Sequence, residues 1–583
     1  MRGREQAEAT RARWPWSLVS TLLAAAMLAS ATMMMALGSR LTFFLDDWVF
    51  ILYRRGFNAD TLLQPDNEHL VAGPVAVWQL MLNTFGMDSV VPFRVVSTAM
   101  FLLGAWFLFL WIRRRLGEWP ALIGTIPILF LGAAFDDFLW FSSITFLGSM
   151  AGGLGMLVAL DRRDRLGDWL ACTGLIVSML FSSLWLAFAA GAVVDVVLRR
   201  KDRAWWRRAY VVLLPLALYA IWWLGWGTEE GSITLENIAN TPFFVLDSLT
   251  AAVAALLGLA APAERFVSPS GVDLGQLFAL ALIALAVWRL RQIERIPRSF
   301  WVVLAVGLAF WVLGGIAVKP GRVPWASRYQ YPGAAFVLLV GAELLRGVRL
   351  DRRWMAAVAA GVLVVSLVGN ARVLDDAYKT HRFTTQLIKA DLAAMEIARY
   401  TVEANFFIDE ENGDTGFAHV DAGSYLNARD SFGSPADTQD QLLNTTEPAR
   451  FAADKVLVSA LRFGLAPVPT STLPGGKPRA AELDAEGLIS IPEGTCVSVP
   501  DGSRGSLLSL PPAGATVEAG RTAVTDIKMR RFATEQFSVD FQEGAEPGRA
   551  VEIRIPPDTS AVPWKMRLEG GAATVCGLRP EPT

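Results

Sequence analysis

Apolar runs separated by short polar links dominate the first two thirds of the chain. Up to about residue 371, stretches rich in Leu, Val, Ala, Phe and Trp alternate with links that carry arginine. A helix needs about 20 apolar residues to cross the hydrocarbon core of a bilayer, so each long run predicts a membrane-spanning helix. Beyond residue 371 the sequence becomes rich in Asp, Glu, Gly, Pro and Thr. The pattern predicts a polytopic α-helical membrane domain over 15–371 and a water-soluble part after it.

The arginines set the predicted topology. Basic clusters occur at 113–115, 162–165, 199–208, 289–298 and 346–353, and the positive-inside rule places them all in the cytoplasm. The spans that follow directly are 15–38, 90–112, 119–135, 142–160, 208–227, 275–291, 299–318, 330–346 and 354–371. The first of these has a basic start but no small-residue cleavage site, so we expect a retained helix rather than a signal peptide.

Whether two further apolar blocks cross the membrane follows from the number of crossings that keeps all the arginine clusters on the same side. The block from Asp168 to Leu198 has cytoplasmic charges at both ends, so it should cross twice, as two short helices that turn around Ser182 and Ser183. The stretch 245–261 must then remain outside, as an interfacial or re-entrant helix. This gives about eleven spans in a plasma (inner) membrane, with residues 1–14 cytoplasmic and the C-terminal part extracytoplasmic.

The soluble part divides into two predicted segments. Residues 372–486 are helical and mixed, beginning with a stalk helix that continues the last span. Residues 487–583 contain short alternating stretches between Gly, Pro and Asp turns, which predict a β-sandwich or an α/β domain. Cys496 and Cys576 lie in two of these stretches, and an oxidising compartment would let them form a disulfide.

Composition narrows the class of protein. The chain is 53% hydrophobic and 19% charged, below the roughly 25% charge of an average soluble protein. The net charge of −2 gives no sign of a nucleic-acid partner, and no phosphate-binding Gly-rich loop is present. The many Ala, Arg and Trp residues suggest a bacterial membrane protein with the lipid bilayer as its surroundings.

An acidic pair follows the first apolar run. Asp46 and Asp47 stand in "LTFFLDDWVF", at the start of a predicted external loop over 39–89. Such charges often mark a membrane boundary, but the aromatic neighbours would also desolvate the pair and favour a raised pKa. Glu68 and His69 follow in the same loop and are further groups that move protons or bind metal. The pair therefore either marks the membrane boundary or belongs to a functional site.

A second acidic pair and a cationic loop add to this pattern. Asp136 and Asp137 lie at the outer end of the third span, where helix capping or loop solvation is the alternative explanation. The external stretch "KPGRVPWASRYQYP" breaks the positive-inside pattern, because it carries three cations beside aromatic residues. Its members of interest are Lys319, Arg322, Arg328 and Tyr329. Arginine suits bidentate phosphate binding, whereas the alternative is a solvated loop with anchoring aromatics.

This layout resembles the GT-C glycosyltransferase superfamily of integral membrane enzymes that use polyprenyl-phosphate sugars. The resemblance rests on a hydrophobic first span, an acidic pair at its outer end, a long first external loop and many later spans. It implies that a first-loop carboxylate is the catalytic base, which falls on Asp46 or Asp47, with Asp47 preferred. It also implies that Arg328 contacts the lipid phosphate, with Lys319, Arg322 and Tyr329 beside it.

The resemblance further implies substrates and a possible metal. Asp136 or Asp137 would bind a metal or the acceptor, and Glu68 and His69 would position substrate. If a divalent cation (Mg, Mn or Ca) takes part, Asp47 and Asp136 would supply its oxygen ligands. The implied partners are a polyprenyl-phosphate-linked sugar, hexosyl or pentosyl, and a glycan, lipid or protein acceptor of the cell envelope.

Two other classes of function remain open. A transporter or flippase of lipid-linked glycans should show charges near mid-span and inverted repeats with broken helices, and the sequence shows few such charges and no clear repeat. A non-catalytic glycan-binding member of the same fold would carry the same motifs. Three scattered histidines, His69, His381 and His419, do not form a zinc motif.

Overall fold

The computed structural model describes residues 17–200, 208–227, 233–260, 274–319, 321–348, 353–408, 420–462, 464–469, 477–484, 487–500, 502–521 and 525–580. The chain forms two compact units. The helical unit contains residues up to 41, 54–81 and 90–381, and the C-terminal unit contains 42–53, 82–89 and 382–583. The predicted N-terminal segment 1–14 and His419 lie outside the described residues.

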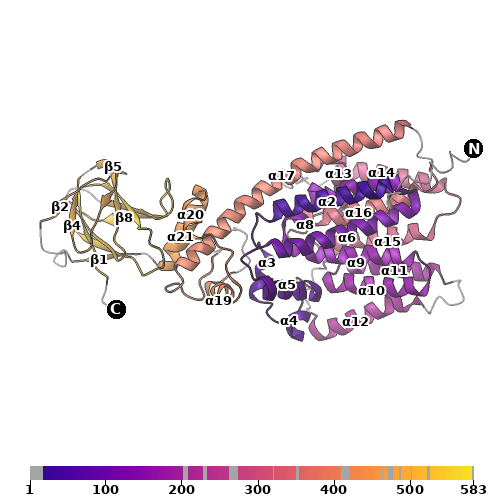
Figure 1. The fold of residues 1–583 in the computed structure, drawn as a ribbon, viewed down its shortest axis with the longest axis horizontal. Helices are drawn as coiled ribbons and strands as arrows, with labels where there is room; N and C mark the ends of the chain where they lie inside the picture. Colours follow the sequence, from indigo (N-terminus) through magenta and orange to yellow (C-terminus); the bar gives the residue numbers. More distant parts are fainter. Residues whose placement is uncertain are drawn as a thin grey trace, which may run out of the picture. The chain divides into compact units, whose positions relative to one another are not determined.

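Helices make up most of the helical unit (Figure 1). They are α2 (Leu18–Gly38), α4 (Ala59–Leu63), α5 (Ala72–Phe85), α6 (Val91–Leu116), α7 (Glu118–Leu129), α8 (Phe135–Leu139), α9 (Ile144–Leu160), α10 (Arg165–Phe181), α11 (Trp185–Leu198), α12 (Tyr210–Trp226), α13 (Leu235–Leu256), α14 (Leu274–Arg291), α15 (Arg298–Ile316), α16 (Ser327–Leu344) and α17 (Arg353–Ile397). Among the described residues, six helices are long and apolar enough to cross a membrane, or seven if the bent pair α7–α8 is one span. The unit is therefore a helical membrane domain, and the predicted total of about eleven spans is not confirmed.

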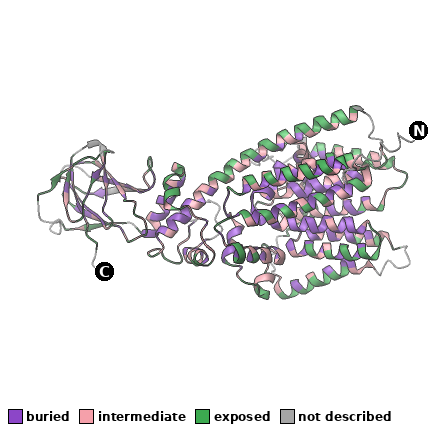
Figure 2. Cartoon of the chain, viewed as in Figure 1, coloured by how far each residue is buried: buried purple, intermediate pink, exposed green. Residues whose placement is uncertain are grey.

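Helix α9 lies at the centre of this unit, and small residues explain its close packing. Most of its side chains are buried, as the purple helices inside the bundle in Figure 2 illustrate. A Cβ on Gly152 would lie 2.7 Å from the carbonyl oxygen of Gly174, so only glycine lets α9 approach α10 at this point. The hydroxyls of Ser149 and Ser178 join the same two helices at 2.8 Å.

The two short helices predicted within 168–198 are present as α10 and α11, with the turn at Ser182. Helix α13 begins ten residues before the predicted stretch 245–261 and passes the length and apolarity test for a span. It packs against both α14 and α15. Asn237 donates to the carbonyl of Ile316 at the end of α15, and Thr250 donates to Gly275 at the start of α14. The predicted interfacial or re-entrant position of this stretch stays a prediction.

In its described residues, the C-terminal unit combines short helices with two sheets. Its helices are α3 (Asp46–Leu52), α19 (Ala422–Phe432), α20 (Gln439–Leu443) and α21 (Glu447–Leu461), together with the end of α17. Its strands are β1 (Leu465–Val468), β2 (Arg479–Ala480), β3 (Ile489–Ser490), β4 (Cys496–Val499), β5 (Gly502–Ser509), β6 (Gly514–Ala519), β7 (Thr525–Arg530), β8 (Val539–Ala545), β9 (Ala550–Arg554), β10 (Lys565–Gly570) and β11 (Ala573–Gly577). One sheet has the order β1-β9-β6-β11-β4-β2 and the other β3-β5-β10-β7-β8. The sheets meet where β8 contacts β6 and β9.

The predicted β domain is thus present but starts earlier than residue 487, because β1 and β2 join its first sheet. The predicted disulfide is confirmed: Cys496 and Cys576 are directly opposed on the antiparallel strands β4 and β11 and are bonded. The continuous 45-residue helix α17 also confirms that the last apolar run extends into a stalk helix.

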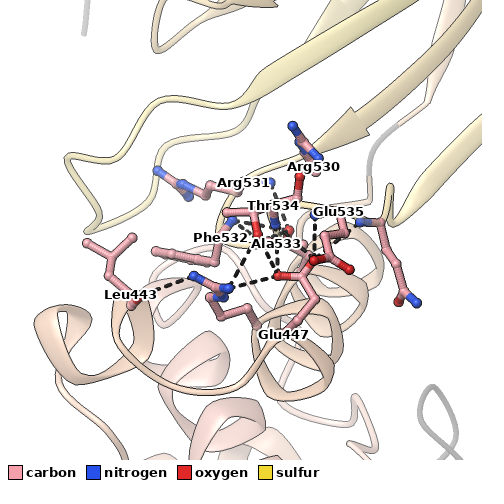
Figure 3. Close-up of polar contacts among 11 residues, drawn as sticks. Leu443, Glu447, Arg530, Arg531, Phe532, Ala533, Thr534 and Glu535 are labelled. Atoms are coloured by element: carbon pink, nitrogen blue, oxygen red, sulfur yellow. Dashed lines mark hydrogen bonds and ion pairs between the residues drawn. The ribbon is translucent and has the colours of Figure 1, made fainter. Parts of the chain in front are cut away.

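Two carboxylates of helix α21 bind the turn between β7 and β8, and Figure 3 shows the contacts of Glu447, the first of them. Glu447 accepts hydrogen bonds from the backbone amides of Thr534, Glu535 and Gln536 in the turn between β7 and β8. Seven residues further along α21, Asp454 is fully buried and accepts from the amides of residues 531–533, which directly precede Thr534. These backbone amides lie beyond the paired residues of β7 and β8, and the hydrogen bonds to the two carboxylates satisfy them. The bonds therefore hold the turn against the helix.

Candidate functional site

A tight turn presents the predicted first-loop residues Glu68 and His69. Asp66 and His69 exchange two backbone hydrogen bonds, at 3.0 and 2.8 Å. The two central residues of the turn, Asn67 and Glu68, both have positive φ, 46° and 70°, as in a type I′ turn. Asn tolerates this conformation, whereas Glu adopts it at a cost of about 1 kcal/mol or more. The turn is supported from behind by Arg54, whose guanidinium donates to the carbonyls just before it.

Both residues line a cavity of about 470 Å³ inside the helical unit. Its walls are mostly aromatic and aliphatic, from α9, α12, α13 and α15, and the α10–α11 turn at Ser182 and Ser183 also borders it. The polar lining groups are few, as expected of a pocket that orients an apolar ligand by its head group. They include Glu68, His69, Arg322 and Tyr329. Residues from the predicted first loop and the predicted late loop therefore meet in one cavity.

The charges at this polar end are paired across the two loops. Lys319 forms an ion pair with the Glu68 carboxylate. Burial, and then the positive charge of Arg322, lower the pKa of His69 to about 4. The imidazole is therefore neutral at physiological pH and can donate or accept a hydrogen bond without adding charge.

The second acidic pair lies beside the start of α16. Asp137 is almost completely buried, and neither of its carboxylate oxygens has a hydrogen-bond partner among the described residues. The backbone amide of Asp136 donates to the Ser327 hydroxyl at 2.9 Å. The positive charge of Arg328 interacts electrostatically with both carboxylates. Its guanidinium also donates a hydrogen bond to the Gly321 carbonyl and lies over the Tyr329 ring. The predicted groups Asp136, Asp137, Arg328 and Tyr329 are thus neighbours.

Two residues of this cluster were not predicted from the sequence. His381 Nε2 lies 3.9 Å from Asp136 Oδ1, and its ring packs edge-on against Phe135. The positive charge of the buried Arg94 interacts electrostatically with the imidazole of His381. Arg94 offered one signal in the sequence, because it lies at the predicted outer end of the span 90–112, where the positive-inside rule disfavours arginine. His381 gave none, since it lies just beyond the last predicted span.

Asp46 and Asp47 belong to the C-terminal unit. They form the first turn of α3, directly after Leu45, whose positive φ of 45° is unusual for a branched apolar residue. Asp47 is fully buried, and one of its oxygens accepts the amide of Phe44 at 2.9 Å. The predicted desolvation of Asp47 is therefore present. Its approach to the cluster around Asp136 stays a prediction.

In the part of the chain that the structure describes, no three His, Cys, Asp or Glu side chains gather as a metal site would require. A cation held by Asp47 and Asp136 stays a prediction.

Comparison with known proteins gives little further guidance. No model of a known protein family matches the chain, and no curated protein matches it. Two solved structures do, both of the arabinofuranosyltransferase AftD from Mycobacteria, one of them a mutant form. Each has a TM-score of 0.37 and 13% identity over 96% of this chain. The chain spans only 58% and 61% of the length of those two structures. A likeness at this level assigns neither fold nor function to the chain.

Proposed function

We propose that the protein is a membrane glycosyltransferase of the GT-C type. It moves a hexosyl or pentosyl group from a polyprenyl-phosphate donor to an extracytoplasmic glycan, lipid or protein acceptor. The observation that supports this is the cavity of about 470 Å³ in which an apolar wall ends at a cluster of Glu68, His69, Lys319 and Arg322. Such a site suits a molecule with an apolar tail and an anionic, hydroxyl-rich head.

The chemistry needs a base and cations. A sugar on a lipid phosphate is already activated, because the phosphate leaves as a stable anion when the bond between its oxygen and the anomeric carbon breaks. The acceptor hydroxyl loses its proton as it forms the new bond, and a positioned carboxylate accepts that proton. Asp47 is assigned this role and Asp46 is the alternative. Lys319, Arg322 and Arg328 stabilise the charge that builds on the departing phosphate.

The remaining polar groups position the substrates. Glu68 and the neutral His69 would hold the sugar or acceptor by hydrogen bonds at the polar end of the cavity. Asp136 and Asp137 would orient the acceptor, and Tyr329 would pack beside the phosphate. The arginine clusters support an N-terminus in the cytoplasm and a C-terminal unit outside, because they recur at one end of the apolar runs.

Transfer from a labelled polyprenyl-phosphate sugar by the purified full-length protein tests the proposal. Replacing the base, by Asp47→Asn or Asp46→Asn, should lower the transfer rate by about 10²–10⁴-fold. Asp60→Asn is the matched control, because it makes the same change at an exposed position of the same loop and should leave the rate within about twofold.

Two outcomes would contradict the proposal at different points. Full transfer by both asparagine variants would remove the base assignment while leaving the enzyme class. Absence of transfer by the unmodified protein from every donor would overturn the class, and movement of a lipid-linked glycan across liposomes would then favour the transporter.

A further inference from the structure

A second cavity, of about 560 Å³, lies at the opposite end of the helical unit. Helices α9 and α15 relate the two cavities. Phe146 near the start of α9 lines the first cavity, and Leu160 at its end lines the second. Arg298 at the start of α15 lines the second, and Ile316 at its end lines the first. The second cavity therefore lies at the end that the positive-inside rule assigns to the cytoplasm.

Arginines dominate the lining of this cavity. It is bordered by the ends of α6, α9, α11, α12, α15 and α16, so that sequence-distant cations converge there. The lining residues carry five arginines and two aspartates: Arg163, Arg199, Arg208, Arg298, Arg346, Asp161 and Asp195.

Several of these arginines form ion pairs. Arg199 pairs with Asp195 at 2.7 Å, and Arg208 pairs with Asp168 at 3.1 Å. Arg346 reaches Glu343 only at 3.9 Å, and Glu343 is already paired with the buried Arg115. Arg115 also pairs with Asp161 at 2.9 Å. Among the described residues that line the cavity, the arginines outnumber the carboxylates.

We infer that this cavity binds a phosphate-bearing anion. The volume fits a small polar head group, and arginine forks match phosphate oxygens bidentately. Basic pockets between transmembrane helices on the cytoplasmic side bind the head groups of anionic lipids, and a soluble phosphate ester offers the same chemistry. The cavity takes no part in the proposed sugar transfer, which occurs at the other end of the bundle.

Binding to the purified full-length protein in detergent tests this inference. The probes are phosphatidylglycerol, phosphatidylcholine at the same content, and inorganic phosphate. Retention of lipid in native mass spectrometry and the thermal unfolding midpoint are the readouts. We expect phosphatidylglycerol to bind more tightly than phosphatidylcholine. If inorganic phosphate competes with it, the site takes a soluble phosphate group, and if not, the lipid head group is the ligand. Either result supports the inference.

The informative variant removes two cations of the lining, Arg163→Gln with Arg346→Gln. Both side chains are exposed at the rim, so the fold should persist. Losing two arginines near a membrane surface should weaken binding by about 30-fold. The matched control, Arg165→Gln with Arg200→Gln, removes the same charge from exposed positions outside the lining and should change binding by less than about threefold.

The single variant Arg346→Gln guards against misfolding of the double variant and should weaken binding by about fivefold. The inference is overturned if the unmodified protein neither distinguishes the two lipids nor responds to phosphate. It is equally overturned if the control pair weakens binding as much as the lining pair, because general surface charge would then explain the effect.

Discussion

Removing the charge of Glu447 should loosen the turn between β7 and β8. Its carboxylate accepts three backbone amides and the Thr534 hydroxyl, and it also pairs with Arg450. Burial alone would raise the pKa of Glu447, but these hydrogen bonds outweigh it and lower the pKa to about 2. Glu447→Gln keeps the shape and removes the charge, so the amides lose a charged acceptor.

The size of the effect follows from this pKa. A fall from 4.5 to about 2 corresponds to about 3 kcal/mol of preference for the ionised form. The side chain is 17% exposed, so solvent screening reduces this to about 2 kcal/mol. Amide hydrogen exchange of residues 534–536 in the full-length protein, followed by mass spectrometry, should therefore accelerate by about 30-fold at pH 7.

Glu535→Gln is the matched control, because it removes one charge from an exposed residue of the same turn. Exchange in that variant should stay within about twofold of the unmodified protein. The pH dependence has a definite sign. Because the pKa of Glu447 is depressed, its stabilisation is present above pH 4.5 and is lost as the pH falls toward 2. Equal protection in Glu447→Gln and the unmodified protein at pH 7 would refute the reasoning.

Three further predictions concern other parts of the chain. Cys496→Ser should lower the stability of the C-terminal unit by about 4 kcal/mol, because the bond closes a loop of 80 residues; thermal unfolding with and without reductant measures this, and an unchanged midpoint would contradict it. The pKa of His69 is lowered from 6.5 to about 4 in the folded protein. As the pH falls, the unfolded chain therefore binds a proton at this imidazole at a higher pH than the folded chain does. Stability should therefore rise from pH 4 to 6.5, and His69→Asn should remove that part of the rise in unfolding scans. Gly132→Ala would place a Cβ 1.8 Å from a carbonyl oxygen of α17. In thermal unfolding in detergent it should therefore destabilise the helical unit by about 1–3 kcal/mol. Gly341→Ala is the control, because its Cβ would have no neighbour within 4 Å and should not destabilise the unit.

The sequence predicted those elements that are determined by the residues within them and directly beside them. Long apolar runs and flanking arginines located most helices of the membrane domain, because the bilayer imposes a minimum length and a charge bias. The late-loop cations were also found this way, since Lys319 and Arg322 break the bias. Both then contact or flank the first-loop residues Glu68 and His69.

Long-range contacts and very short elements were not predictable. His381 lies 245 positions after Asp136, and only the course of α17 past α8 brings the two together. The strand β2 has two residues, too few to show an alternating pattern. The stretch 456–465 fits either a strand or a buried helix by its sequence pattern, and its first residues lie in helix α21.

The distribution of charge along the central helices bears on the choice between enzyme and transporter. Helix α15 contains no charged residue after Arg298, its first, and α9 contains none. The 19 residues of α15 extend about 28 Å, and the two cavities lie at its opposite ends. A transporter of a sugar phosphate would need polar groups or broken helices between those ends. These two helices instead offer a continuous apolar surface, so a path for such a ligand would have to run along other helices, such as the bent pair α7–α8.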